Sequence, residues 1–225
     1  MKYRLTDETM KWQGHILHRI EAMKDFGIVK EGDKGGWIEK EENLSQYGDC
    51  WVYDMANVYD SSKVYDDAVV YGSAKVYANA LVRDSAVVCG SSVVCGNAKV
   101  YDSAKVCGNA KVYDSAKVYG NAKVFGNTNV CDSAVVCGNA KVYDSAKVCG
   151  NAKVCSERDY IVFKNWWSSG RYFTWTRSNN MWKVGCFYGT GEELTKKAYK
   201  DSEESGREYE RIVKYVETIL KEEQK

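Results

Sequence analysis

The sequence predicts a mainly β protein whose central half is a parallel β-solenoid, and three observations support this fold class. From Asn43 to Ser156 the chain divides into 19 consecutive hexads with the consensus [Ser/Asn]-Ala-[Lys/Val]-Val-[Tyr/Cys]-[Asp/Gly]. The fourth slot is valine in every hexad from Val52 through Val154. The hexads meet at Gly-Asn and Asp-Ser junctions, which are turn residues. A fixed short period of this kind is the sequence signature of stacked coils.

Each hexad is expected to form one short strand followed by a corner. Alanine and valine lie two residues apart, so in an extended segment they point to one side while the third and fifth slots point to the other. The Gly-Asn and Asp-Ser junctions are turn residues that accept left-handed backbone angles. We therefore expect Val100 and Val118 to point into the solenoid, and Lys99 and Lys117 to point outward.

The hexad resembles the repeat of the hexapeptide-repeat proteins, which are left-handed parallel β-helices with three hexads in each triangular coil. The resemblance covers about half of the chain. It implies a left-handed parallel β-helix of about six 18-residue coils, roughly 30 Å long at about 4.8 Å per coil. The left hand is implied by the resemblance and not by the period. Residues 18 apart would then form outer ladders, the first of which is Tyr53, Tyr71, Cys89, Cys107, Phe125 and Tyr143.

Two segments outside the repeat complete the predicted organisation: an N-terminal β cap over residues 1–42 before the β-helix of residues 43–156, and a C-terminal α+β module over residues 157–225. In the cap, Gln13-Gly14 is the predicted turn of a β-hairpin. Its Phe26-Gly27, Gly32-Asp33 and Gly35-Gly36-Trp37 elements resemble the cap of hexapeptide-repeat proteins common in phage and prophage genomes. Those proteins are usually labelled acyltransferases or polymer-forming proteins on fold alone.

The C-terminal β-hairpin/helix module is expected to hold three strands and two helices. Thr190 with Glu193 forms a capping box that predicts the start of the first helix, and Gly206 is the predicted break before the second. The module carries more large apolar side chains than so short a segment is expected to bury alone. We therefore predict an interface made by Trp166, Trp167, Arg171, Tyr172, Trp175, Arg177, Trp182, Lys183, Phe187, Tyr209, Ile212, Val213, Val216 and Leu220.

The chain contains two histidines, His15 and His18, both in the cap, so few residues could carry histidine-based catalysis. Acyltransferases of this fold resemble one another in a catalytic histidine that acts as a general base, and a base must titrate near neutrality. The predicted β-helix contains no histidine, so the sequence predicts that the protein is not an enzyme and has no catalytic residue. A zinc site with three histidine ligands is excluded within the repeat, and we predict no metal site and no cofactor.

The nine cysteines are expected to be free thiols. The N-terminus has no apolar segment typical of a secretion signal, which favours a reducing, cytoplasmic location. Seven cysteines occupy the slot that tyrosine otherwise fills, a pattern unlike a disulfide framework. Cys89/Cys107, Cys131/Cys149 and Cys137/Cys155 would be neighbours in adjacent coils, within the distance range of a disulfide, but each pair lacks two further ligands for a metal ion.

Among function classes, the resemblance to phage-type proteins implies a non-catalytic, phage-encoded interaction protein that binds and blocks a host macromolecule, such as a component of CRISPR-Cas or another antiviral defence. A hexapeptide-repeat acyltransferase and a self-assembling structural protein stay open as alternatives. The expected partners are a second or third copy, held mainly by residues 157–225, and a host protein. A formal net charge of +1 gives little support to nucleic-acid binding. The sequence has no run of 18 apolar residues, so we expect no membrane partner.

Overall fold

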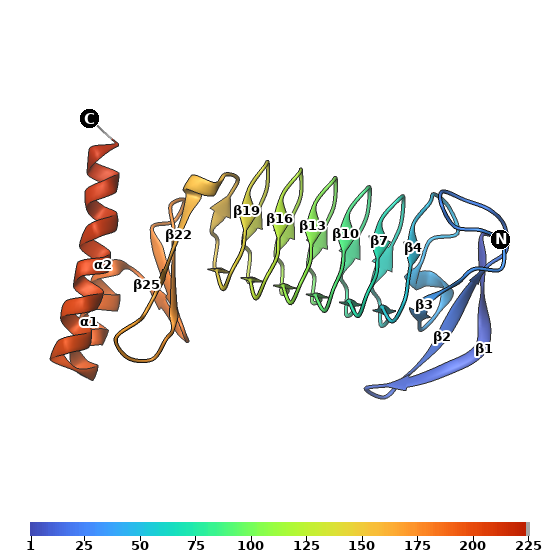
Figure 1. The fold of residues 1–225 in the computed structure, drawn as a ribbon, viewed down its shortest axis with the longest axis horizontal. Coiled ribbons are helices and arrows are strands. Elements are labelled where there is room, and N and C mark those ends of the chain that lie inside the picture. The colour runs from blue at the N-terminus through green and yellow to red at the C-terminus, as the bar shows by residue number, and fades with distance from the viewer. Residues whose placement is uncertain (224–225) are drawn as a thin grey trace. The chain divides into compact units, whose positions relative to one another are not determined.

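The structure is a computed structural model that describes residues 1–223. The chain forms two compact units, Met1–Glu157 and Arg158–Lys225. The first unit contains the cap and a stack of parallel coils, and the second contains a four-stranded sheet with two helices (Figure 1). The fold class is the predicted one, a left-handed parallel β-helix flanked by a β cap and an α+β module.

Three parallel sheets form the faces of the β-helix, and each is named here by its first hexad strand. The β4 face contains β4 (Trp51–Val52), β7 (Val69–Val70), β10 (Val87–Val88), β13 (Lys105–Val106), β16 (Lys123–Val124) and β19 (Lys141–Val142). The β5 face contains β5 (Asn57–Val58), β8 (Lys75–Val76), β11 (Val93–Val94), β14 (Lys111–Val112), β17 (Asn129–Val130) and β20 (Lys147–Val148). The β6 face contains β6 (Lys63–Val64), β9 (Leu81–Val82), β12 (Lys99–Val100), β15 (Lys117–Val118), β18 (Val135–Val136) and β21 (Lys153–Val154).

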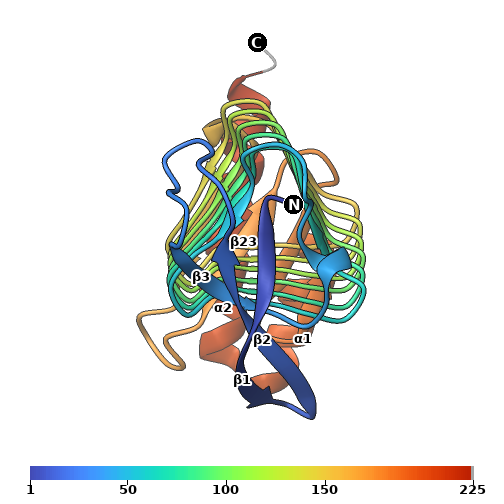
Figure 2. The same cartoon turned by 90° about the vertical axis from the view of Figure 1, so that its right-hand side faces the viewer.

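The register of these strands confirms three hexads per coil. Lys99 pairs with Lys117 and Val100 with Val118, and every pair in the three faces joins residues 18 apart. The coils therefore superpose when the stack is viewed end on (Figure 2). Val100 and Val118 are fully buried, whereas Lys99 and Lys117 are exposed, as the two-residue alternation predicts. Every fourth-slot valine is at most 1% exposed, so a column of valines forms the core.

The corners explain why the sixth slot is aspartate or glycine. Asp102 has φ of 57°, and its Oδ2 accepts a hydrogen bond of 2.9 Å from the N–H of Gly120 in the next coil. The aspartate therefore occupies the left-handed corner and also caps a backbone donor 18 residues later. Where glycine stands, as at Gly90 with φ of 70°, a Cβ atom would lie 2.9 Å from the backbone N of Gly108, so the stacked corners leave no room for a side chain.

The cap is an antiparallel sheet that continues into the β-helix. Strands β1 (Tyr3–Trp12), β2 (His15–Ala22) and β3 (Lys34–Ile38) pair in that order, and the turn lies at Gln13–Gly14 as predicted, with both φ values positive. Strand β3 then pairs in parallel with β5, and Leu44 forms a bridge to Val64 after the short helix η1 (Glu41–Asn43). The cap thus adds a partial coil, and the solenoid has about seven turns instead of the predicted six.

Gly35 and Gly36 allow this closure over the first coil. Both residues are buried in β3. A Cβ atom on Gly35 would lie 2.6 Å from the carbonyl oxygen of Val52, and one on Gly36 would lie 2.8 Å from that of Ala56. The Gly-Gly pair therefore allows the cap strand to pack closely on the open end of the first coil. That open end is where a solenoid needs a cap.

The second unit begins with the short helix η2 at its boundary (Glu157–Asp159) and continues as an antiparallel sheet. Its strands are β22 (Tyr160–Lys164), β23 (Tyr172–Thr176), β24 (Met181–Val184) and β25 (Phe187–Gly189), followed by α1 (Gly191–Asp201) and α2 (Glu203–Glu222). The capping box is confirmed: Thr190 Oγ1 accepts the N–H of Glu193 at 3.3 Å, and Glu193 Oε2 accepts the N–H of Thr190 at 2.8 Å. Among the helices of residues 1–223, none is long and apolar enough to cross a membrane.

The break between the helices lies at Ser202, so the predicted break at Gly206 is wrong. Ser202 has an extended backbone, with φ of −168° and ψ of 156°, and its hydroxyl accepts the N–H of Ser205 at 3.1 Å. Gly206 lies inside α2, where a Cβ atom would overlap the ring of Tyr199 on α1. This glycine therefore allows α2 to pack closely against α1, and it does not end a helix.

Candidate functional site

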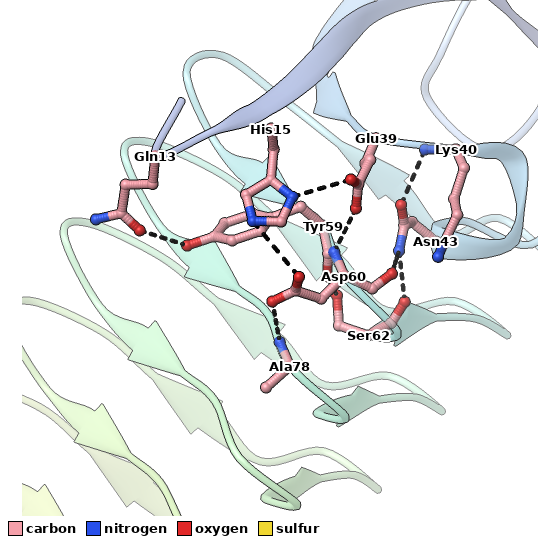
Figure 3. A network of polar contacts seen from close by, with 9 residues as sticks. All are labelled: Gln13, His15, Glu39, Lys40, Asn43, Tyr59, Asp60, Ser62 and Ala78. Atoms are coloured by element: carbon pink, nitrogen blue, oxygen red, sulfur yellow. Dashed lines mark hydrogen bonds and ion pairs between the residues drawn. The ribbon is translucent and has the colours of Figure 1, made fainter. Parts of the chain in front are cut away.

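The cap hairpin brings His15 between two carboxylates of the first coils. His15 begins β2, Glu39 directly follows β3, and Asp60 is the corner residue after β5. The Nδ1 atom of His15 lies 2.9 Å from Glu39 Oε1, and its Nε2 atom lies 3.5 Å from Asp60 Oδ1 (Figure 3). These three residues, called here the His15 cluster, come from three elements that are far apart in the sequence.

Backbone hydrogen bonds orient both carboxylates of the His15 cluster. The N–H of Asp60 donates to Glu39 Oε2 at 2.7 Å, and the N–H of Ala78 donates to Asp60 Oδ2 at 3.0 Å (Figure 3). One oxygen of each carboxylate thus accepts a backbone N–H, and the other oxygen faces the imidazole. The orientation of the carboxylates is set before any substrate binds, as a catalytic or binding site requires.

The imidazole packs on a tyrosine that belongs to the β5 face. The ring centroids of His15 and Tyr59 are 5.0 Å apart, and the Tyr59 hydroxyl donates to Gln13 Oε1 at 3.3 Å. Tyr59 in turn stacks on Tyr77 of the next coil at 5.1 Å. The hairpin turn is therefore held against the first coils by the same residues that position His15.

A buried asparagine fixes the corner that carries Asp60. The side-chain Nδ2 of Asn43 donates to the carbonyl oxygens of Asp60 at 3.0 Å and Ser62 at 2.9 Å, and its Oδ1 accepts the N–H of Lys40 at 3.0 Å (Figure 3). Asn43 is fully buried, and its polar atoms are satisfied by these bonds. The end of the cap and the first corner of the β-helix are thus connected through one side chain.

Electrostatics in the His15 cluster favour the imidazolium form. The hydrogen bond from His15 to Glu39 raises the pKa of His15, burial opposes the shift, and the charges of Glu39 and Asp60 add to it. Burial alone would raise the pKa of the Glu39 carboxyl, but the hydrogen bonds from His15 and from the backbone of Asp60 outweigh it and lower this pKa. When the imidazole is neutral, its Nδ1–H donates to Glu39 and Nε2 carries the free lone pair.

The His15 cluster also has the donor set of a divalent-cation site. His15, Glu39 and Asp60 each offer one ligand atom, and these atoms lie within 4.8 Å of one another. The zinc site that the sequence excludes would need three histidines within the repeat, whereas this trio draws its ligands from the cap and the first coil. A second group within residues 1–223, Cys131 with Asp132 and Cys149, has its two sulfur atoms joined in a disulfide, so those thiolates are not available to a metal ion.

The prediction of free thiols is wrong for six cysteines. Disulfides join Cys89 to Cys107, Cys131 to Cys149 and Cys137 to Cys155, with Cα–Cα distances of 4.6, 4.8 and 4.4 Å. The parallel register places same-slot residues of adjacent coils within disulfide reach. The prediction of free thiols was based on cysteine and tyrosine sharing one slot, and it did not take this register into account. Cys50, Cys95 and Cys186 are free.

The predicted interface residues of the second unit divide between its core and its surface. Trp175, Trp182, Val213 and Val216 are buried in one apolar cluster with Phe173, Val184 and Leu194. Trp167, Phe187, Tyr209, Ile212 and Leu220 are partly buried against that cluster, Tyr172, Arg177 and Lys183 are half-buried, and Arg171 and Trp166 are exposed. Because two helices cover the sheet, the module buries more of these side chains than we expected; an interface role for the others stays a prediction.

Comparison with known proteins returned no matching family model. The chain is 39% identical over 62 residues to a protein of Escherichia coli (strain K12) named "Uncharacterized acetyltransferase YdcK". The match covers 24% of this chain and 19% of that relative, so the chain spans about a fifth of the relative's length.

This similarity overturns the prediction that the protein is not an enzyme. The prediction relied on the absence of histidine from the repeat, and it did not foresee that the cap hairpin carries His15 to the side of the first coils. The strand pattern around Gln13-Gly14 was a signal that could have suggested this, because it predicts a hairpin whose tip projects His15. The comparisons give no support to a phage-encoded blocking protein.

Proposed function

We propose that the protein is an acyltransferase of the hexapeptide-repeat type in which His15 is the general base. The observation that carries the proposal is the 2.9 Å contact between His15 Nδ1 and Glu39, which leaves Nε2 as the basic nitrogen. A histidine oriented by a carboxylate through its other nitrogen is the arrangement that activates hydroxyl and amine nucleophiles. The similarity to a protein named as an acetyltransferase supports this reaction class.

The chemistry would proceed from an acyl thioester and an acceptor that bears a hydroxyl or amine. His15 Nε2 takes the proton from the acceptor as its oxygen or nitrogen attacks the thioester carbonyl carbon. The tetrahedral intermediate then collapses, the carbon–sulfur bond breaks, and the departing thiolate receives the proton from His15. Glu39 holds the ring, while Asp60, 3.5 Å from Nε2, stabilises the imidazolium that exists between the two transfers.

The surface beside the His15 cluster has room for a substrate group. A hollow of about 360 Å³ adjoins Asp60 and is lined by Lys40, Glu42, Asn43, Asp60, Ser61, Ser62 and Lys63. The side chains of His15, Glu39 and Asp60 are 28%, 26% and 36% exposed. The base is therefore reachable from solvent, while Glu39 and the buried ring of Tyr59 hold its orientation.

The test is transfer of a radiolabelled acetyl group from acetyl-CoA to a panel of amines and alcohols. A label is preferable to a thiol reagent because Cys186 is a free, exposed thiol. His15→Gln should lower the rate by about 10² to 10⁴, the usual contribution of a general base. His18→Gln is the matched control, because His18 Nδ1 instead lies 3.2 Å from the carbonyl oxygen of Thr6. Absence of transfer by the unaltered protein, or equal rates in the two variants, would contradict the proposal.

A further inference from the structure

The β4 face differs from the other two faces because its outer side chains change character along the stack. In the first three coils the third slot holds Trp51, which is buried against Tyr3 and Phe26, followed by the half-buried Val69 and Val87. In the last three coils it holds the exposed Lys105, Lys123 and Lys141. The first two coils also carry the carboxylates Asp49, Asp54 and Asp67 beside this slot. One end of the face is therefore apolar and acidic, and the other end is basic.

The fifth slot of the same face is symmetric about its centre. Its ladder reads Tyr53, Tyr71, Cys89, Cys107, Phe125 and Tyr143, so two aromatic residues precede and two follow a central cysteine pair. Tyr71, Phe125 and Tyr143 are 40%, 39% and 39% exposed, and between residues 49 and 156 they are the aromatic side chains that stand out as exposed. Exposed aromatic residues gathered on one face of a protein commonly mark an interface.

A hollow at the acidic end has the chemistry to receive the basic end. It measures about 450 Å³ and lies between the loop Gly27–Val29 and the first coils of the face. Its walls are Ile28, Val29, Val69, Tyr53 and Tyr71, with carboxylates from Asp49, Asp54 and Asp67. None of these three carboxylates is in an ion pair within residues 1–223. Two of these carboxylates accept a backbone N–H, Asp54 Oδ2 from Gly72 at 3.1 Å and Asp67 Oδ1 from Asp49 at 3.0 Å. Aromatic walls beside carboxylates that lack a cationic partner suit aromatic and cationic side chains, which Phe125, Tyr143 and Lys123 supply at the opposite end.

We propose that the β4 face binds the β4 face of a second copy of this chain in the antiparallel orientation. The two-fold axis would lie in the plane of the face, at right angles to the coil stack, between the levels of Val87 and Lys105. Such an axis reverses the order of the coils but keeps each column of slots opposite itself. Tyr71 then meets Phe125 of the second copy, and Tyr53 meets its Tyr143. The contact is isologous, so each pairing occurs twice.

The same axis pairs opposite charges. Lys123 lies opposite Val69 of the second copy, with Asp67 of that copy two residues earlier, in the corner before β7, within reach of the lysine ammonium. Lys141, which bonds Glu157 in its own chain at 3.1 Å, lies opposite the coil that carries Asp49. A parallel pair would instead oppose lysine to lysine along half of the face. Charge complementarity therefore selects the antiparallel orientation.

The area of the face sets the expected strength of association. Six coils at about 4.8 Å and a face roughly 17 Å wide give about 500 Å² per copy, or about 1,000 Å² in total. That total is near the lower limit for a specific interface, so a dimer should form and dissociate readily. Asp54 opposes Asp144 of the second copy in this register, and Asp144→Asn should therefore strengthen the dimer.

Charge reversal in the full chain, followed by sedimentation velocity over a range of concentrations, tests the proposal. Asp67→Lys or Lys123→Asp alone places like charges together at two positions and should weaken association at least tenfold. An equimolar mixture of the two variants should restore it, because both contacts then join a lysine to an aspartate. Lys117→Asp, at the same slot on the β6 face and likewise exposed, is the control and should leave association unchanged.

Orientation is tested by cross-linking through introduced cysteines. Because positions 71 and 125 are the same-slot neighbours of Cys89 and Cys107, the test uses a chain that also carries Cys89→Ala and Cys107→Ala. In the antiparallel pair, Tyr71→Cys together with Phe125→Cys should then form a disulfide between copies, whereas Tyr71→Cys alone should not. A cross-link through position 71 alone would indicate a parallel pair and overturn the proposal. So would a protein that stays monomeric at 100 µM, about a hundred times a micromolar Kd, or a dimer that neither charge reversal weakens. The last outcome would favour the second unit as the contact between copies.

Discussion

Loss of the disulfide between Cys89 and Cys107 should destabilise the β-helix by about 3 kcal/mol. The bond closes a loop of 18 residues, and the loop-closure entropy of a chain of that length corresponds to about 3 kcal/mol at 25 °C. The double variant Cys89→Ala/Cys107→Ala removes this constraint from the unfolded chain. Both positions lie in the outward fifth slot, so the change leaves the valine core intact. The loops of Cys131–Cys149 and Cys137–Cys155 overlap, and their contributions should sum to less than twice this value.

The assay is urea denaturation followed by circular dichroism, with and without a reductant. At a slope of about 2 kcal/mol/M, a loss of 3 kcal/mol lowers the midpoint by about 1.5 M. Cys95→Ala is the matched control, since Cys95 occupies the same slot of another coil and is free; its midpoint should be little changed by comparison. The reasoning would be refuted by equal midpoints for the double variant and the unaltered protein, or by nine reactive thiols in the denatured, unreduced chain where three are expected.

Four further predictions concern the core, the corners and the His15 cluster. Val100→Asp would bury an unpaired charge at a fully buried position and should unfold the coils in circular dichroism, whereas Lys99→Asp on the same strand should stay folded. Gly90→Ala should cost about 1–3 kcal/mol in thermal unfolding, because its positive φ and the adjacent backbone leave no room for Cβ. The rate of acyl transfer should rise with pH through the pKa of His15, which lies above the ordinary value of 6.5. Glu39→Gln should move that rise to lower pH. An unmoved pH profile would show that the contact with Glu39 does not raise the pKa of His15. The stabilising effect of protonated His15 should be present below pH 6.5 and lost as pH rises through its raised pKa.

The coils of this protein follow from local pattern alone. A strict six-residue period with valine in one slot favours an arrangement in which every fourth-slot valine is buried, and aspartate or glycine at the sixth slot matches the left-handed corner. Strand positions, the inward direction of Val100, the Gln13–Gly14 turn and the Thr190 capping box could all be predicted because each depends on residues close together in the sequence. The left hand of the solenoid came from the resemblance and not from the period.

The chemistry of the protein depended on contacts that no local pattern records. His15 meets Glu39 and Asp60 because the hairpin folds back on coils formed later in the chain. The disulfides arise because the 18-residue register brings same-slot sulfur atoms together, a consequence of stacking that outweighed the composition of the slot. Burial of Trp175 and Trp182 required two helices to cover their sheet. In each case the deciding distance joins residues from different elements, and only the packed chain brings those elements together.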